Sequence, residues 1–220
     1  MTGTARRVRF DPHVHTKASH DARGTVEAVL EACRDRGLDA VAITDHDTTT
    51  AARRAVDVGD RHGVLVVPGV EVSTADGHLL GLGVTAAPPV GRPFAATVEW
   101  IRDRGGLAVV PHPFQRSRHG VGRSVIDDCD GVESFNAWSM SGLQNRRAAA
   151  LARRRGYPGL GGSDAHRPGM VGTAYTELLV DGEPTRNALL SAVDDGLCRA
   201  VGDSTTVGTY LREYAAALAR

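Results

Sequence analysis

The sequence predicts an α/β fold with a mostly parallel sheet, and three observations support this class. Short apolar runs rich in β-branched residues alternate with stretches that have helical spacing. Polar residues gather directly after these runs, at the expected carboxyl ends of the strands. The 220 residues, 41% of them hydrophobic, suit one globular domain that is large enough to close a barrel.

The expected strands follow one another along the chain. Their apolar runs are short, as is typical of buried parallel strands. They are VRF at 8–10, DAVAIT at 39–44, VLVVPGV at 64–70, LAVVP at 107–111, GVESFN at 131–136 and YPGLGGS at 157–163, with HLLGLGV at 78–84 as a further candidate.

Helix-like stretches connect these runs, and each ends at a glycine, a common helix stop. The expected helices lie within residues 25–37, 49–63, 94–105, 142–156 and 183–196. A final helix is expected from residue 204, with Tyr210, Leu211, Tyr214 and Leu218 on its packed face. The sequence therefore predicts one barrel-sized domain over 1–203 and a C-terminal helix over 204–220 packed on its outside.

The charge balance bears on the class of partner. The 26 basic and 26 acidic residues cancel, so the net charge does not indicate nucleic acid or an anionic membrane as an obligate partner, although it leaves a local basic patch open. No apolar run has the length of a membrane span, and the N-terminus lacks the apolar part of a secretory signal. We therefore expect a cytoplasmic protein without membrane contact.

Two pairs of polar residues are spaced two apart at expected strand ends. His13 and His15 form the first pair, and Asp164 and His166 form the last. Side chains at i and i+2 of an extended strand point to the same face. Each pair can therefore present two donors to one metal ion.

Further polar residues follow the other strands. Asp47 or a following threonine accounts for a helix cap, whereas Asp45 is a candidate to orient a ligand histidine and His46 to bind metal. Glu71 directly follows an apolar run, where a carboxylate is costly unless it is paired or metal-bound. His112 lies between two prolines that stiffen its backbone.

These clusters together predict a metal centre. Mixed nitrogen and oxygen donors in this number suit two or three divalent ions such as Mn²⁺, Fe²⁺ or Zn²⁺, and they are too many for one tetrahedral zinc. His62 and His78 are interpreted as structural. Either His20 or Asp21 can supply the ligand at their position, and we favour Asp21. The expected ligands are His13, His15, Asp21, His46, Glu71, His112, Asp164 and His166.

Five motifs in this order resemble those of the PHP superfamily, which is named for polymerase and histidinol phosphatase. They are DPHVHTKAS, ITDHDT, GVEVS, PHP and GGSDAH, between residues 11 and 166. The resemblance implies a distorted (β/α)7 barrel with the metal site at the C-terminal ends of its strands, and a phosphoesterase that uses two or three metal ions. The chain is most similar to the small stand-alone members, which include enzymes of nucleoside 3′,5′-bisphosphates and short RNA ends.

The resemblance also implies how the ligands are divided. One ion would bind His13, His15, Glu71 and Asp164. A second would share Glu71 and bind His112, with Glu133 as a further candidate, and a third would bind the residue at 20–21, His46 and His166. The sequence departs from these enzymes in reading SHDA where they usually have SDG, and in lacking their long insertion before the PHP motif.

Several side chains near the expected ligands are candidates for binding a phosphate. They are Lys17, Arg116, Arg118, His119 and Asn136. Arginine binds phosphate through two parallel hydrogen bonds, so Arg116 and Arg118 are also expected to act in catalysis, with His20 as the acid for the leaving group. The expected reaction is attack by a metal-bridging hydroxide on a phosphate ester of a small metabolite or nucleotide, with nucleic acid only as a short substrate.

Two other functions share parts of this pattern. A metal-dependent hydrolase of an amide or ring, similar to amidohydrolases, would share the histidines, but it would ordinarily use a carboxylated lysine, and Lys17 is the only lysine. A non-catalytic metal-binding module is the other alternative. The completeness of the clusters argues against it.

Overall fold

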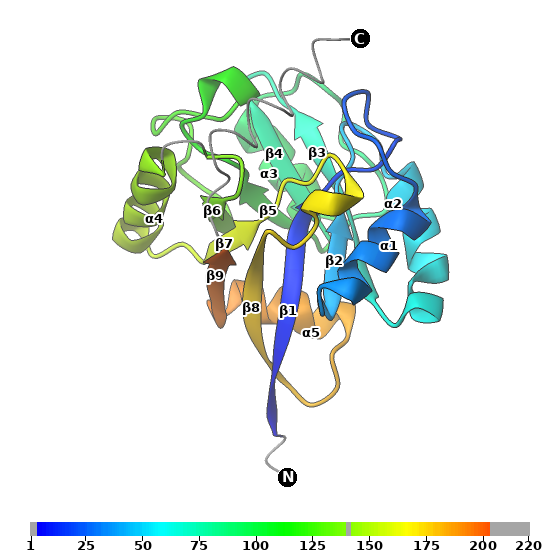
Figure 1. The fold of residues 1–220 in the computed structure, drawn as a ribbon. Helices are drawn as coiled ribbons and strands as arrows, with labels where there is room; N and C mark the ends of the chain where they lie inside the picture. The colour runs from blue at the N-terminus through cyan, green and yellow to red at the C-terminus, as the bar shows by residue number, and fades with distance from the viewer. Residues whose placement is uncertain (1–3, 140–141, 203–220) are drawn as a thin grey trace.

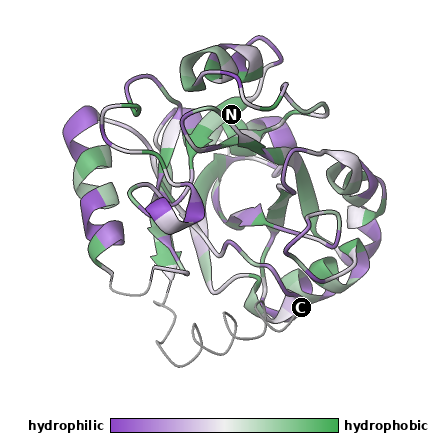
Figure 2. Cartoon of the chain, turned by 90° about the horizontal axis from the view of Figure 1, so that it is seen from above, coloured by the Kyte–Doolittle hydropathy of each residue, from purple (hydrophilic) through white to green (hydrophobic). Residues whose placement is uncertain are grey.

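One continuous sheet curves until its two edges meet, with helices on the outside (Figures 1 and 2). The computed structural model describes residues 4–139 and 142–202. The strands lie in the order β7-β6-β5-β4-β3-β2-β1-β8-β9. They are β1 (Ala5–Val14), β2 (Ala40–Ile43), β3 (Leu65–Ser73), β4 (His78–Leu82), β5 (Leu107–Val110), β6 (Gly131–Asn136), β7 (Gly159–Gly162), β8 (Ala174–Asp181) and β9 (Cys198–Gly202).

The sheet is a distorted barrel, as expected, because two parallel sections are joined by antiparallel strands. β1, β2 and β3 are parallel to one another, and so are β5, β6 and β7. β4 runs antiparallel to both β3 and β5, while β8 and β9 form an antiparallel extension beside β1. The strand expected over 78–84 is thus confirmed as the link between the two sections.

Hydrogen bonds between β7 and β8 contribute to the closure of the sheet. Gly161 of β7 donates its N–H to Thr176 Oγ1 of β8 at 3.0 Å, and the same hydroxyl donates to the Gly161 carbonyl at 2.9 Å. A Cβ at Gly161 would overlap the Tyr175 carbonyl oxygen, so only glycine lets β7 approach β8 this closely.

The five helices expected within the described residues are present. They are α1 (Val26–Asp35), α2 (Thr50–Val58), α3 (Phe94–Arg102), α4 (Leu143–Arg155) and α5 (Arg186–Asp194), and short 3-10 turns occupy Gly59–His62, Arg116–Arg118 and Pro168–Met170. Thr25 caps α1 by accepting from the Ala28 N–H at 3.2 Å. Gly156 ends α4 at a φ of 74°, a left-handed conformation that glycine adopts without strain.

The core lies both inside the barrel and between the barrel and its helices. Phe10, Leu80, Leu82 and Leu160 are fully buried inside the barrel cluster, while α1 and α2 bury Leu30 and Ala55 against the outer surface of the strands. No helix among the described residues is long and apolar enough to cross a membrane. The helix expected over 204–220 lies outside the described residues, so the domain boundary at 203 stays a prediction.

Strand register brings the carboxyl ends of the parallel strands to one level. Val14 pairs with Ile43, and Ile43 pairs with Pro68. Beyond the strand ends, His46 bridges to Glu71 and Val14 bridges to Ala165. Side chains that are far apart in the sequence therefore meet at one end of the barrel, as expected for active sites of such barrels.

Candidate metal centre

Glu71 stands at the centre of the polar cluster and divides its histidines into two sets. Its Oε2 atom lies 3.3 Å from His13 Nε2 and 3.2 Å from His15 Nε2. Its Oε1 atom lies 2.9 Å from His112 Nε2 and 3.0 Å from His78 Nδ1. A carboxylate with different nitrogen donors around each oxygen has the arrangement of a bridge between two cations.

His78, which the sequence analysis interprets as structural, lies in this cluster and is a further candidate ligand. His46, Glu71 and His78 form one of the groups whose donor atoms all lie within 4.8 Å of one another. His78 begins β4, where antiparallel pairing with β3 sets it opposite Ser73 and beside Glu71. The only signal in the sequence was its place at the start of an apolar run, which does not reveal the strand to which it pairs.

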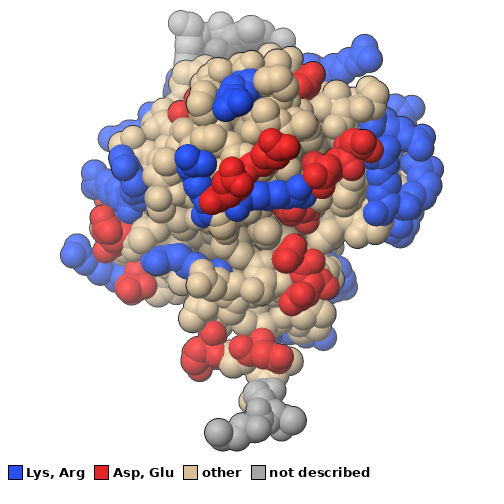
Figure 3. Space-filling model, turned by 180° about the vertical axis from the view of Figure 1, so that it is seen from behind, with Lys and Arg blue, Asp and Glu red and all other residues tan. Residues whose placement is uncertain are grey.

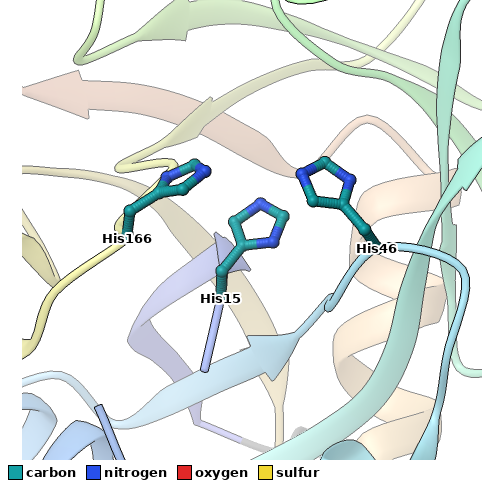
Figure 4. Close-up of side chains that lie close together, drawn as sticks. All are labelled: His15, His46 and His166. Carbon is teal, nitrogen blue, oxygen red and sulfur yellow. The ribbon is translucent and has the colours of Figure 1, made fainter. Parts of the chain in front are cut away.

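A third set of donors joins three segments of the chain. The rings of His46 and His166 lie 4.6 and 4.5 Å from the His15 ring, centroid to centroid, and Figure 4 shows the three rings converging. Asp21 Oδ2 lies 3.1 Å from His166 Nε2 and 3.4 Å from His46 Nε2. Burial alone raises the pKa of Asp21, but its bonds with His166 and His46 outweigh burial and hold that pKa well below its usual range.

His20 differs from its neighbour Asp21 in its surroundings. It is exposed and lines the pocket, and its ring lies 5.3 Å from that of His46. Asp21 directs a carboxylate oxygen between two donor histidines, whereas His20 stands at the edge of the cluster. This placement favours Asp21 as the ligand and leaves the His20 imidazole accessible to a bound molecule.

Asp164 approaches the cluster from the end of β7. Its Oδ1 lies 3.5 Å from both His13 Nε2 and His166 Nδ1. Its Oδ2 accepts from Asn136 Nδ2 at 3.0 Å and pairs with Arg118 Nη1 at 2.5 Å. The backbone of Asp164 has a φ of 54°, a sparsely populated conformation for a residue with a side chain, of the kind that clusters at functional sites.

Ser19 determines the tautomer of His15. Its hydroxyl donates to Asp45 Oδ1 at 2.7 Å and accepts from the His46 backbone N–H at 3.0 Å. Since its one hydrogen is used, Ser19 Oγ can only accept from His15 Nδ1, which lies 3.1 Å away. His15 therefore carries its hydrogen on Nδ1 and offers the Nε2 lone pair to a metal. Asp45 thus acts on the tautomer of His15 through Ser19, and the assignment of His15 as a metal ligand stays a prediction.

His13 and His166 are set in the same tautomer by other acceptors. His13 Nδ1 lies 3.2 Å from Glu133 Oε1, and His166 Nδ1 lies 2.9 Å from the Asp164 carbonyl oxygen. Both partners only accept, so each neutral ring keeps its hydrogen on Nδ1 and exposes Nε2. Glu133 also accepts from the His112 backbone N–H at 2.7 Å. It thus lies behind the donors and orients them.

Gly162 makes the contact between His13 and Glu133 possible. A Cβ at this position would overlap Glu133 Oε1 and lie 3.0 Å from His13 Cβ. The group that approaches Gly162 closely is therefore the Glu133 carboxylate.

The donor set fits divalent ions. Ligand atoms held about 2.0–2.2 Å from one ion lie roughly 2.8–3.6 Å from one another, and the atoms around Glu71 lie 2.9–3.4 Å from it. His112 Nδ1 and Asp164 Oδ1 are buried and have no hydrogen-bond partner within residues 4–139 and 142–202. Burial lowers the pKa of His112, which favours the neutral imidazole that binds metals.

A pocket of about 820 Å³ opens above these donors. Arg116, Arg118 and His119 line it, as do Asp21, His46, Glu71 and His112. The His119 ring lies 5.0 Å from that of His78.

Two expected substrate residues do not line this pocket. Lys17 is exposed, whereas Asn136 is fully buried. Asn136 Nδ2 donates to Glu133 Oε2 at 2.8 Å and to Asp164 Oδ2 at 3.0 Å. It therefore holds two carboxylates in place instead of contacting a substrate.

Comparison with known proteins agrees with the fold and the motifs. A family model described as PHP-associated matches residues 142–198. The chain is 34% identical over 152 residues to an uncharacterised protein of Methanocaldococcus jannaschii, covering 64% of this chain and 89% of that protein. A two-domain protein from Bacteroides vulgatus containing a predicted PHP-like metal-dependent phosphoesterase has the same fold, with a TM-score of 0.75 at 16% identity over 98% of this chain and 71% of that chain.

Two enzymes are similar over shorter stretches. The phosphoribosyl 1,2-cyclic phosphate 1,2-diphosphodiesterase of Eggerthella lenta is 45% identical over 85 residues, covering 36% of this chain and 32% of the enzyme. The 5′-3′ exoribonuclease Rnm of Salmonella typhimurium is 36% identical over 102 residues, covering 44% of this chain and 34% of the enzyme. The chain thus spans about a third of each enzyme's length.

The fold is that of PHP-like metal-dependent phosphoesterases of known structure, and the donor clusters could hold metal ions. The chain belongs to the PHP superfamily.

Proposed function

We propose that this protein hydrolyses a phosphate ester of a small metabolite or nucleotide, with two or three Mn²⁺, Fe²⁺ or Zn²⁺ ions held by the eight expected ligands and His78. The observation that carries the proposal is the position of Glu71, whose two oxygens face different histidines at the base of the pocket. Such ions, when bound, lower the pKa of a water molecule and neutralise charge on a phosphate.

Arg118 supports a phosphate substrate. Its guanidinium reaches Asp164 at 2.5 Å and lies 5.0 Å from the centroid of the Trp138 ring, so its position is fixed from two sides. Arg116 is exposed on the same loop. Two guanidinium groups beside the donors can hold non-bridging phosphate oxygens during attack.

His20 supplies the proton that the leaving group needs. It lines the pocket, and in our proposal no metal engages its ring, so an imidazole N–H can be given to the departing oxygen. The attacking water gives one proton to solvent as its oxygen bonds to phosphorus. The bond from phosphorus to the leaving oxygen breaks, that oxygen takes the proton from His20, and solvent returns a proton to His20.

Lys17 weighs against the amidohydrolase alternative. A carboxylated lysine would have to stand between the metal donors, but the only lysine is exposed and does not line the pocket. A cytoplasmic location, proposed from the sequence, agrees with the cytosolic chemistry of small phosphate esters.

The test uses p-nitrophenyl phosphate and its bis-ester with each metal in turn. Wild type should hydrolyse at least one of them, and a chelator should abolish the rate. Glu71→Gln should lose activity and bound metal, whereas the matched change Glu183→Gln, on an exposed side chain, should alter neither. Activity that persists in Glu71→Gln with chelator present would contradict the proposal.

A further inference from the structure

Asp47 lines the pocket, although the proposed reaction gives it no role and the sequence offered it only as a candidate helix cap. Thr49 occupies the N-cap position of α2 instead. Asp47 accepts two hydrogen bonds from Ser73, from its backbone N–H at 2.7 Å and from its hydroxyl at 2.8 Å. The backbone of Asp47 has a φ of 57°, a conformation that few residues with side chains adopt. Its half-buried carboxylate is therefore held in one position at the pocket.

Asp76 adds a second fixed carboxylate to the pocket lining. It lies in the turn between β3 and β4, and its Oδ2 accepts from the backbone N–H of Phe94, the first residue of α3, at 2.9 Å. The turn is also held from its other end, because the His78 backbone N–H donates to the His119 carbonyl oxygen at 2.9 Å. Asp76 is exposed, so its carboxylate is accessible to a bound molecule.

Charge is separated along the pocket. Among the described residues that line it, those before His112 in the sequence include Asp47 and Asp76 but no lysine or arginine. Those after His112 include Arg116 and Arg118 but no acidic residue. On the back of the molecule, by contrast, acidic and basic side chains are interspersed, apart from a group of arginines on α4 (Figure 3). The separation within the pocket is therefore a local feature.

The proposed acid directs the leaving group toward the two carboxylates. The His20 ring lies 5.3 Å from the His46 ring, and Asp47 directly follows His46 in the chain. A leaving oxygen that takes the proton of His20 therefore has the rest of its molecule on the side of Asp47 and the β3–β4 turn. No phenylalanine, tyrosine or tryptophan of the described residues lines the pocket, so a nucleobase finds no such ring on which to stack.

Two fixed carboxylates distinguish leaving groups by their chemistry. An ionised carboxylate only accepts hydrogen bonds, so hydroxyl groups are suitable partners for it. A second phosphate brings negative charge close to both carboxylates, and contacts between like charges are strongly unfavourable.

We propose that Asp47 and Asp76 bind hydroxyl groups of the leaving group, so that the preferred substrates are phosphate esters of a sugar or another polyol. Esters whose leaving group carries a second phosphate are rejected. The proposal rests on the phosphoesterase function and deepens it by naming the class of substrate. Both residues determine specificity, and neither takes part in the bond that breaks.

The test compares kcat/KM for fructose 6-phosphate and fructose 1,6-bisphosphate, which differ only by the second phosphate. Wild type should prefer the monophosphate by at least about tenfold. Asp47→Asn/Asp76→Asn keeps the size of both side chains but removes their charges, so it should bring the ratio of the two values close to one. The control Asp57→Asn/Asp60→Asn removes the same charge from exposed positions outside the pocket and should keep the wild-type ratio.

The ratio separates specificity from damage to the fold, because a loss of folded protein lowers both values by the same factor. Asp76→Asn alone, at an exposed position, should move the ratio in the same direction by a smaller factor.

The outcomes distinguish this proposal from the function on which it rests. Wild type that hydrolyses p-nitrophenyl phosphate but does not prefer fructose 6-phosphate contradicts the specificity and leaves the phosphoesterase function standing. A preference that is unchanged in both asparagine variants also overturns the specificity. If no phosphate ester is hydrolysed with any of the metals, the phosphoesterase function fails, and the specificity fails with it.

Discussion

The floor and the rim of the pocket are built in opposite ways. The floor consists of Glu71 and the histidines around it, which are buried or half-buried and lie at or just beyond the ends of β1, β2, β3 and β5 and at the start of β4. The rim includes residues 116–125, in which Arg116 and Arg123 are exposed and Arg118 is half-buried. The comparison indicates a division of roles. Donors fixed by burial and hydrogen bonds can hold metal ions in place, whereas exposed side chains on a loop can contact the substrate and determine which substrate binds.

The largest expected effect tests whether His78 belongs to the floor. His78→Ala removes a nitrogen donor from Glu71 Oε1 and should lower the rate by more than the roughly 10²–10³-fold cost of losing one electrostatic donor. Metal analysis should show fewer ions per chain. His62→Ala, in the 3-10 turn that follows α2, is the control and should keep both rate and metal. Full metal content in His78→Ala would show that His78 is not a metal ligand.

The next effect separates two neighbours at the boundary between floor and rim. Asp21→Asn should reduce the metal content because Asp21 reaches His46 and His166. His20→Ala should keep the metal and lower kcat by about 100-fold, the lower end of the range for a general acid. Elemental analysis of both variants measures the bound metal, and initial rates measure kcat. Loss of metal in His20→Ala with full metal in Asp21→Asn would make His20 the ligand.

A third prediction concerns proton competition on the floor. Burial lowers the pKa of His13, but Asp164 and Glu71 outweigh burial and raise it well above its usual value; the pKa of His15 is also raised. Metal binding must displace these protons, so affinity should fall as pH decreases, beginning above pH 6.5. The slope should be about tenfold per pH unit for each proton displaced. Calorimetric titration with Zn²⁺ in buffers of different ionisation enthalpy measures proton release, and affinity that is constant from pH 8 to 6 would contradict this.

The smallest expected effect concerns Ser19, which does not bind metal itself but accepts a hydrogen bond from His15. Ser19→Ala removes the acceptor that sets the His15 tautomer, and it should weaken metal binding by roughly tenfold, the lower end of the range for such partners. Chelator competition measures the affinity. Ser73→Ala is the control. It removes a hydroxyl that is hydrogen-bonded to Asp47 and should leave the metal affinity unchanged. Equal affinities in the two variants would assign Ser19 no orienting role.

Sequence patterns were most informative where a local rule applies. Alternating elements, glycine stops such as Gly156 and paired residues such as His13 and His15 follow from periodicity within one segment. The same rules fail where a partner is distant. His78 joined the donors only through the β3–β4 register, and Asn136 was expected in the pocket but is buried between two carboxylates.

The sequence by itself determined the class of fold, the end of the barrel where the site lies and most residues that form it. Each of these depends on spacing along one strand or on the residues just beyond its carboxyl end. Only the tertiary structure decided which histidines face each oxygen of Glu71, that Ser19 sets a tautomer and that Asn136 is buried between two carboxylates. These depend on distances between segments, which are set by how the closed sheet aligns its strands and not by any single stretch of residues.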